Sequence, residues 1–360
     1  MQIKRVILRN VRNFVEFDRS FEDPWNERVP DSLLLIGPNG SGKTTVLEVI
    51  SGLWQLLGNY FQEREEDPGG RASVVVPDVV WPDLAAVEIV GLEREPIWVY
   101  HGEKRVCHEF ARKQEGSHRI GTCYDAGFSS GEYVEYGSYL GPGTTWQQQW
   151  AQRLTENILG KRADLPNVVY LESETRVLLP LEEKFSVQPE AEEFHWLARY
   201  EPTTSRKGSL HNYLYNLKVV DEATFQAIID QVNAFLIGKR LTGFNRRGEL
   251  MVRVDGGGSH SIDDFSSGEK QVLLMIATIT RWLRPGGVVL IDEPDLHLHP
   301  SLTTAFVGHL RRMIADKQGQ LLIASHAPEL WQDFTPSISV NLRLKGPSPG
   351  RPGDGAQSLS

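Results

Sequence analysis

A glycine-rich segment between an apolar run and a helical pattern constrains this chain more than any other feature. The segment reads Gly37-Pro-Asn-Gly-Ser-Gly-Lys-Thr44 and directly follows the apolar run at residues 32–36. An apolar run without alternation is typical of a strand that is buried on both faces of a parallel sheet. A buried strand, a glycine-rich loop and a helix beginning near Lys43 form half of a βαβ unit. The sequence therefore predicts a parallel α/β sheet.

The residue types in this segment suit the binding of phosphate groups. Glycines let successive backbone N–H groups surround phosphate oxygens, and the helix adds the positive end of its dipole. Lys43 is expected to reach the β- and γ-phosphates of a nucleotide, and the hydroxyl of Thr44 to ligate Mg²⁺. The predicted nucleotide-binding residues are Gly37, Pro38, Asn39, Gly40, Ser41, Gly42, Lys43, Thr44 and Thr45.

A second apolar run, at residues 288–291, ends in two acidic residues. Asp292 closes this predicted strand and is expected to hold Mg²⁺ together with Thr44. Glu293 follows and is placed to act on the attacking water as a general base. The Asp-Glu pair is a weak signal alone, but combined with the phosphate-binding loop it predicts an ATPase with ATP and Mg²⁺ as cofactors.

Composition narrows the class of protein. The 360 residues, 40% apolar and 24% charged, suit a globular chain of one large domain or two ordinary ones. The net charge of −9 weakens the case for broad, non-specific coating of nucleic acid. Cys107 and Cys123 are too few for a disulfide framework and favour a reduced compartment. No signal-peptide core or membrane-length apolar run occurs, so we expect a cytoplasmic protein without a membrane partner.

The remaining pattern alternates strands with helices. Strands are expected at residues 3–11, 14–17, 97–101, 167–171, 250–254 and 321–324, and helices at 44–57 and 144–159 and from residues 268 and 300 onward. An antiparallel β insertion, with a further strand at 73–76, is expected within about 62–140. Apolar spacing that begins at Phe194 and Leu197 predicts a helical subdomain at about 189–245. The Gly/Pro/Ser-rich residues 346–360 are expected to be a disordered tail.

Two further segments resemble motifs of the ATP-binding-cassette (ABC) ATPases. Residues 265–271, Phe-Ser-Ser-Gly-Glu-Lys-Gln, resemble the signature motif, and Ser266 precedes Asp292 by 26 residues (266 to 292) in the expected order. His326 ends the predicted strand after the metal-binding one, where that superfamily places a switch histidine. The resemblance implies that Ser266 and Gly268 contact nucleotide and that His326 acts in catalysis with Glu293.

The chain also resembles ATPase heads of the overcoming-lysogenisation-defect (OLD), AAA_21-like type, relatives of SMC and RecF-like DNA-repair ATPases. This resemblance rests on Leu8-Arg-Asn-Val-Arg-Asn-Phe14, the phosphate-binding loop and Glu293-Pro-Asp-Leu-His-Leu-His-Pro300. It implies a P-loop NTPase fold of ABC-ATPase type: a mixed central sheet with flanking helices, an antiparallel β insertion and a helical subdomain. The expected ATPase domain spans residues 1–345, with a head split between about 1–60 and 165–345.

The sequence departs from that family in several places. No TOPRIM nuclease domain and no coiled-coil arm is present within these residues. The glutamine that senses the γ-phosphate is not identifiable: Gln147, Gln148 and Gln149 fit by order alone, whereas residues 171–176 hold the expected position without a glutamine. The resemblance also implies that Arg12 contacts nucleotide, although a surface salt bridge is an equal alternative.

Two other groups of residues have competing interpretations. His297 and His299 suggest a metal site, but they follow the catalytic acid, where the superfamily builds a subunit contact, and we favour that contact. The basic pairs at 239–240 and 246–247 either touch a nucleic-acid backbone or form a solvated face, and the solvated face is favoured.

The preferred function is ATP binding and hydrolysis by a head that forms a homodimer on binding ATP. The family resemblance implies a role in DNA repair or phage defence, with a separately encoded nuclease or toxin effector and DNA as further partners. The first alternative is a non-hydrolysing, ATP-dependent scaffold or switch. A transporter ATPase subunit is less favoured, because 223 residues (43 to 266) separate Lys43 from Ser266.

Overall fold

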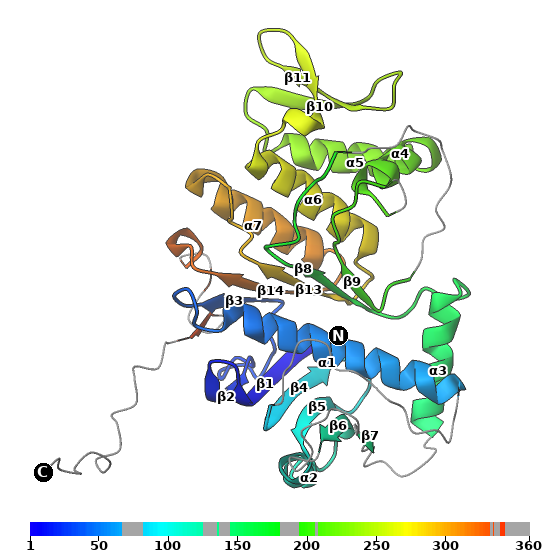
Figure 1. Cartoon of the computed structure of the whole chain (residues 1–360), viewed down its shortest axis with the longest axis vertical. Coiled ribbons are helices and arrows are strands. Elements are labelled where there is room, and N and C mark those ends of the chain that lie inside the picture. Colours follow the sequence, from blue (N-terminus) through cyan, green and yellow to red (C-terminus); the bar gives the residue numbers. More distant parts are fainter. Residues whose placement is uncertain are drawn as a thin grey trace, which may run out of the picture.

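The computed structural model describes residues 1–66, 82–124, 135–136, 145–180, 194–205, 208–331, 334 and 339–342. Two six-stranded sheets lie on either side of the long helix α1 (Lys43–Glu66), as Figure 1 shows. A smaller antiparallel sheet consists of β10 (Lys239–Phe244), β11 (Leu250–Val254) and β12 (Ser259–Ser261). It lies at the opposite end of the molecule from the six-stranded sheet that contains β1 (Gln2–Val11).

The central sheet is parallel throughout its described strands, and the mixed pairing that the family resemblance implied occurs in the other six-stranded sheet. The strand order of the central sheet is β15 (Ser339–Asn341), β3 (Ser32–Ile36), β14 (Gln320–Ser325), β13 (Val288–Asp292), β8 (Val168–Leu171) and β9 (Leu197–Arg199). Along β13, Val288 and Leu290 pack into the core around α1, whereas Val289 and Ile291 pack into the core on the other face. Both faces are therefore buried, which explains the continuous apolar run in the sequence.

Helices cover the second face of the central sheet. They are α4 (Leu210–Val220), α5 (Glu222–Asn233), α6 (Ser267–Trp282) and α7 (Pro300–Ala315). The start of the expected helical subdomain is not helical in the structure. Leu197 lies in strand β9, which pairs with β8 at the edge of the central sheet. Trp196 explains this difference: its ring stacks on Trp54 of α1 at a centroid distance of 4.0 Å. Each indole N–H donates to the other residue's carbonyl at 2.7 Å, which holds the start of β9 against α1.

The other six-stranded sheet has the order β2 (Phe14–Ser20), β1 (Gln2–Val11), β4 (Leu84–Val90), β5 (Ile97–Glu103), β6 (His118–Tyr124) and β7 (Glu135–Tyr136). The expectation of an antiparallel insertion requires one correction, because β5 and β6 run parallel and α2 (Lys104–Arg112) crosses between them. Strand β4 pairs with β1, so this segment extends the N-terminal hairpin. The strand expected at 73–76 and the tail from 346 lie outside the described residues.

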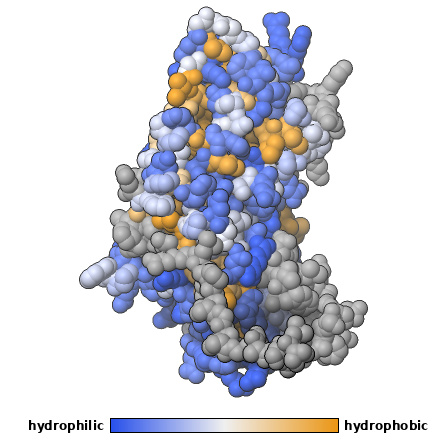
Figure 2. Space-filling model, turned by 60° about the vertical axis from the view of Figure 1, so that its left-hand side comes forward, coloured by the Kyte–Doolittle hydropathy of each residue, from blue (hydrophilic) through white to orange (hydrophobic). Residues whose placement is uncertain are grey.

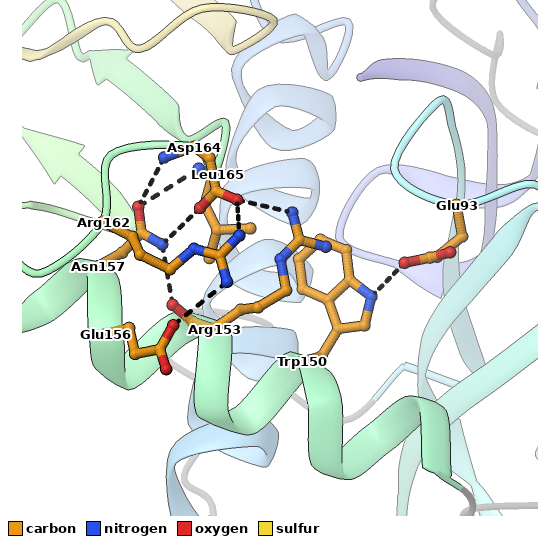
Figure 3. A network of polar contacts seen from close by, with 8 residues as sticks. All are labelled: Glu93, Trp150, Arg153, Glu156, Asn157, Arg162, Asp164 and Leu165. Carbon is orange, nitrogen blue, oxygen red and sulfur yellow. Dashed lines mark hydrogen bonds and ion pairs between the residues drawn. The ribbon is translucent and has the colours of Figure 1, made fainter.

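A polar network fixes the connection from α3 (Thr145–Ile158) to β8, and Figure 3 shows it. Asn157 accepts from the backbone N–H groups of Asp164 and Leu165, and its amide donates to the Asp164 carboxylate at 3.0 Å. The hydrogen bond from Asn157 lowers the pKa of Asp164 most, and a hydrogen bond from Arg162 lowers it further. These hydrogen bonds hold residues 164–165 against the end of α3. They therefore fix where the chain enters β8, the strand beside β13.

Candidate nucleotide site

The strand order brings the predicted site residues to one edge of the central sheet. Parallel strands β3, β14 and β13 are neighbours, so their carboxyl ends meet. The glycine-rich loop follows β3, Asp292 ends β13, and His326 follows β14. In open α/β sheets, ligands bind at this carboxyl edge. The loop lies at the left-hand end of α1 in Figure 1.

The loop has the conformation that its glycines permit. Gly40 and Gly42 have φ angles of 77° and 94°, in the left-handed region that favours glycine. A Cβ at Gly42 would lie 2.5 Å from the ring of Phe14. The turn between β1 and β2 supports the loop, because the Asn13 side chain donates to the carbonyl of Gly40 at 2.6 Å.

Lys43 lies folded over this loop. Its ammonium group donates to the carbonyls of Gly37 and Pro38 at 2.9 and 3.2 Å, and the residue is buried. Ser41 Oγ is also buried and has no hydrogen-bond partner among the described residues. A cation and an unpaired polar atom therefore border the loop, as a site for phosphate oxygens requires.

Asp292 receives two hydroxyl groups on one oxygen. Thr44 Oγ1 and Ser173 Oγ lie 3.0 and 3.1 Å from Asp292 Oδ2. Burial raises the pKa of Asp292, and these two hydrogen bonds act in the opposite direction. Its other oxygen, Oδ1, is buried and has no partner within the described part of the chain. Carboxylate and hydroxyl oxygens suit Mg²⁺, so Asp292 and Thr44 fit the predicted metal role.

The predicted general base and the switch histidine lie together. His326 Nδ1 is 3.3 Å from Glu293 Oε1, and both side chains are partly exposed. Glu293 has a φ of 48°, an uncommon value for a non-glycine residue, which turns the chain directly after β13. Ser325 donates to the Asp295 carboxylate at 2.6 Å and so joins the end of β14 to the loop after β13.

Arg176 is a residue of this site that the sequence analysis missed. It is 2% exposed and donates to the backbone carbonyls of Leu171, Asp292 and Glu293. Burial lowers its pKa to about 10. Its only sequence signal was its position in residues 171–176, where the family's glutamine was expected. Ser173 lies in the same segment and was also missed, because its residue type alone indicates no role.

The signature segment begins helix α6. Ser266 caps the helix in a reciprocal capping box with Glu269, and Ser266 and Ser267 are exposed. A Cβ at Gly268 would lie 2.6 Å from the carbonyl oxygen of His297, so this glycine permits close contact with the loop after β13. Among the described residues, no hydrogen bond or ion pair joins Ser266 or Gly268 to the phosphate-binding loop.

Other predicted residues lie elsewhere. The Arg12 guanidinium forms an ion pair with Glu48 of α1, the surface contact that was one of its two interpretations. Gln147, Gln148 and Gln149 lie in α3, which packs on the far end of α1 through the Phe61–Trp150 ring stack. At 1.5 Å per residue, Phe61 is about 27 Å along the helix from Lys43, too far for these glutamines to sense a γ-phosphate.

The two histidines after the catalytic acid differ in their contacts. His299 caps α7, and its Nδ1 accepts from the backbone N–H of Ser301. His297 has a φ of 66° and an exposed side chain. Within the described ranges, no group of three potential ligands is placed to hold a metal ion. In the same ranges, no helix combines the length and apolar character that a membrane span requires.

Fold and site together define the class of protein, a P-loop ATPase. The AAA_21 family model, described as "AAA domain, putative AbiEii toxin, Type IV TA system", matches residues 152–331, half of the chain. The chain belongs to this family. The family match does not distinguish OLD proteins from other members of AAA_21.

Two relatives and one solved structure illustrate the similarity. Protein ea59 of Escherichia phage lambda is 36% identical over 72 residues, covering 20% of this chain and 14% of that protein. The "Retron Ec83 probable ATPase" of Escherichia coli is 29% identical over 155 residues, covering 37% of this chain and 28% of that protein. The matches thus span less than a third of these curated relatives. An Smc head domain from Pyrococcus furiosus has 13% identity and a TM-score of 0.47, with 96% and 94% of the two chains covered.

Proposed function

We propose that this ATPase works as an ATP-dependent homodimer in which each nucleotide lies between the P-loop of one copy and the signature segment of the other. The observation that carries the proposal is the exposed, capped start of α6, where Ser266 and Gly268 form no hydrogen bond or ion pair with the P-loop of their own chain among the described residues. The capping box occupies the N–H groups of Ser266 and Glu269, and the N–H groups of Ser267 and Gly268 between them favour an anion opposite the helix start. A nucleotide held by a second copy supplies that anion.

Hydrolysis divides among residues at the carboxyl edge of the central sheet. Lys43 and the loop N–H groups bind the β- and γ-phosphates, while Thr44 and Asp292 would hold Mg²⁺. When bound, Mg²⁺ supplies charge neutralisation at the phosphates. Glu293 takes the proton of the attacking water on its carboxylate. His326, whose Nδ1 lies 3.3 Å from Glu293 Oε1, keeps that carboxylate oriented. Arg12 leaves Glu48 to contact the nucleotide.

The character of the exposed surface supports a reversible contact. Figure 2 brings the left-hand side of Figure 1 forward, and among the coloured residues it shows hydrophilic ones over much of the surface, with separate apolar patches between them. Interfaces that form and dissociate are more polar than permanent ones. A dimer that opens after hydrolysis fits such a face.

The decisive experiment tests whether the site is shared between copies. Ser266→Arg should leave nucleotide binding by the monomer nearly intact, while abolishing ATP-induced dimers and turnover. Lys43→Ala lacks a working P-loop but retains the signature segment. Mixing the two variants restores one complete site, so partial ATP hydrolysis should reappear in the mixture alone. If folded variants show no recovery where the parent dimerises, the shared site is wrong and a monomeric switch is favoured.

We further propose that the ATPase serves a DNA-associated process in the cytoplasm, repair or phage defence, with a separately encoded nuclease or toxin effector. Similarity to a retron ATPase supports this role. Four exposed arginines on the β10–β11 hairpin support contact with DNA: Arg240, Arg246, Arg247 and Arg253. Arg240 lies directly opposite Arg253, an unfavourable like-charge pair, and none of the four has an ion pair among the described residues.

Binding to duplex DNA at several salt concentrations tests this surface. Arg240→Glu combined with Arg253→Glu should weaken binding and lower the salt slope by about 2, because two phosphate contacts are lost. Lys113→Glu, which reverses one exposed charge directly after α2, is a single-charge control that should leave the salt slope unchanged. Equal affinity of the double variant and the parent would exclude DNA contact by this sheet.

A further inference from the structure

Buried Arg176 joins two parts of the ATPase that serve different nucleotides in the proposed dimer. It follows β8 and is enclosed between the end of β13 and the first turns of α6. The end of β13 carries the hydrolysis residues of its own P-loop site. The start of α6 carries the signature segment, which faces the partner's nucleotide under the proposed function.

On the hydrolysis side, the guanidinium binds backbone oxygens. Nη2 donates to the Glu293 carbonyl at 2.7 Å, while Nη1 donates to the carbonyls of Asp292 and Leu171. These contacts fix the chain at the point where Glu293 takes its positive φ. Ser173, three residues before Arg176, binds the Asp292 carboxylate itself. Movement of the Asp292–Glu293 segment therefore acts directly on residues 173–176.

On the signature side, Arg176 and Gln271 form a reciprocal pair. Arg176 Nε donates to Gln271 Oε1 at 2.8 Å, and Gln271 Nε2 donates back to the Arg176 carbonyl at 2.6 Å. Gln271 is 5% exposed and lies three residues after Gly268 in α6. Water does not compete for these two hydrogen bonds at such burial, so displacement of Arg176 leaves buried polar groups unpaired unless Gln271 follows.

The geometry of arginine suits this connection. A guanidinium presents several N–H donors in one rigid plane, whereas a lysine ammonium offers one point of attachment. Here that plane reaches three carbonyls and one side-chain amide. We propose that Arg176 is a positioning residue that transmits the nucleotide state of its own P-loop site to the signature helix through Gln271.

This inference rests on the proposed function, because it assigns the signature helix to the partner's nucleotide. In the dimer, one chain's Asp292–Glu293 segment and the same chain's signature segment belong to different composite sites. The Arg176–Gln271 pair is then a direct connection between the two sites. Binding of ATP at one P-loop places the signature segment for the second site.

Hydrogen exchange in the monomer tests the connection without interference from dimer formation. The parent protein is measured with and without ATP and Mg²⁺, at concentrations where sedimentation shows monomers. ATP should slow exchange at the P-loop and also slow the amides of residues 271–275 by at least about 5-fold, the lower end of ordinary coupling between sites. Gln271→Leu should retain the P-loop protection and lose the protection of α6.

Thr278→Val is the matched control, because Thr278 is a buried polar residue of the same helix, seven residues beyond Gln271. It should keep ATP-dependent protection at both places. Gln271→Met serves as the second variant if Gln271→Leu does not fold. Absence of α6 protection in the parent, or its persistence in either folded Gln271 variant, overturns the connection. Absence of P-loop protection in the parent would instead overturn the nucleotide site itself.

Discussion

The hydroxyl of Thr44 lies 3.0 Å from Asp292 Oδ2, which joins the first turn of α1 to the end of β13 across 248 residues of sequence. Thr44 is exposed, whereas Asp292 is buried with its other oxygen unpaired among the described residues. Solvent therefore reaches this pair from the Thr44 side only. A metal ion that enters there meets a hydroxyl and a carboxylate already held in place, next to Lys43 of the phosphate-binding loop.

Replacement of Lys43 by alanine should remove ATP binding. Lys43 is the cation that closes over the loop, and loss of a hydrogen-bonded charge of this kind lowers affinity by at least about 30-fold. Calorimetric titration with ATP and Mg²⁺ measures the effect. Lys113 is an exposed lysine directly after α2 that pairs with Glu109, and Lys113→Ala should bind ATP like the parent. Unchanged affinity of Lys43→Ala would contradict the P-loop assignment.

Glu293→Gln should separate ATP binding from hydrolysis. The amide keeps the shape of the side chain but does not accept the proton of the attacking water. Turnover should fall by about 10²–10⁴-fold, while the contacts of Lys43 and Thr44 with nucleotide remain. The variant should then accumulate as ATP-bound dimers, which light scattering detects. Hydrolysis at the parental rate would assign the base to another residue.

Local motifs account for what the sequence predicted correctly. The P-loop, the buried strands and the helix starts depend on neighbouring residues, so residues 37–45 and the Asp292–Glu293 pair are readable without a structure. ATPase class and fold are confirmed on that basis. The individual roles of the site residues stay predictions: residues 37–45, Asp292, Glu293, Ser266, Gly268, His326 and Arg12.

Contacts between distant strands account for what was missed. Ser173 and Arg176 reach Asp292 only because β8 lies beside β13, an order that no local pattern encodes. The parallel pairing of β5 with β6 depends likewise on the crossover through α2, whose nine residues gave no separable helical signal within a β-rich stretch. Arginine and serine are common residues, and their types alone indicate no role.

Gly268→Ala should damage the signature segment by overpacking. The new methyl group would lie 2.6 Å from the His297 carbonyl oxygen, so α6 and the loop after β13 must separate. We expect a loss of about 1–3 kcal/mol in the free energy of unfolding, with a larger loss of dimer formation than of ATP binding by the monomer.

Gly308→Ala is the matched control for that substitution. Gly308 lies inside α7, and the nearest atom to its added methyl group is Arg312 Nη1 at 3.8 Å. Alanine should therefore stabilise the helix by about 0.5–1 kcal/mol. Denaturant unfolding of both variants distinguishes the two cases, and a stabilised Gly268→Ala protein would show that the close contact with His297 is absent in solution.

His101 should lower the free energy of unfolding in mild acid. The residue is 5% exposed in β5, and its Nδ1 lies 2.7 Å from Thr122 Oγ1. Burial lowers the pKa of His101 from 6.5 to about 4. Between these two values the unfolded chain binds a proton that the folded chain does not. The free energy of unfolding should therefore fall as pH decreases from about 6.5 to 4, by about 3 kcal/mol at most from this residue.

Denaturant unfolding of the parent and of His101→Gln at several pH values between 7 and 4.5 isolates this contribution. Glutamine retains polar atoms near Thr122 but does not titrate, so the variant should lose stability less steeply with decreasing pH. The difference between the two proteins matters rather than either slope, because burial also lowers the pKa of His211 and of His309. His108→Gln, at an exposed position of α2, should follow the parent. Parallel curves for His101→Gln and the parent would mean that His101 takes up its proton in the folded protein as readily as in the unfolded chain, and that its site admits water.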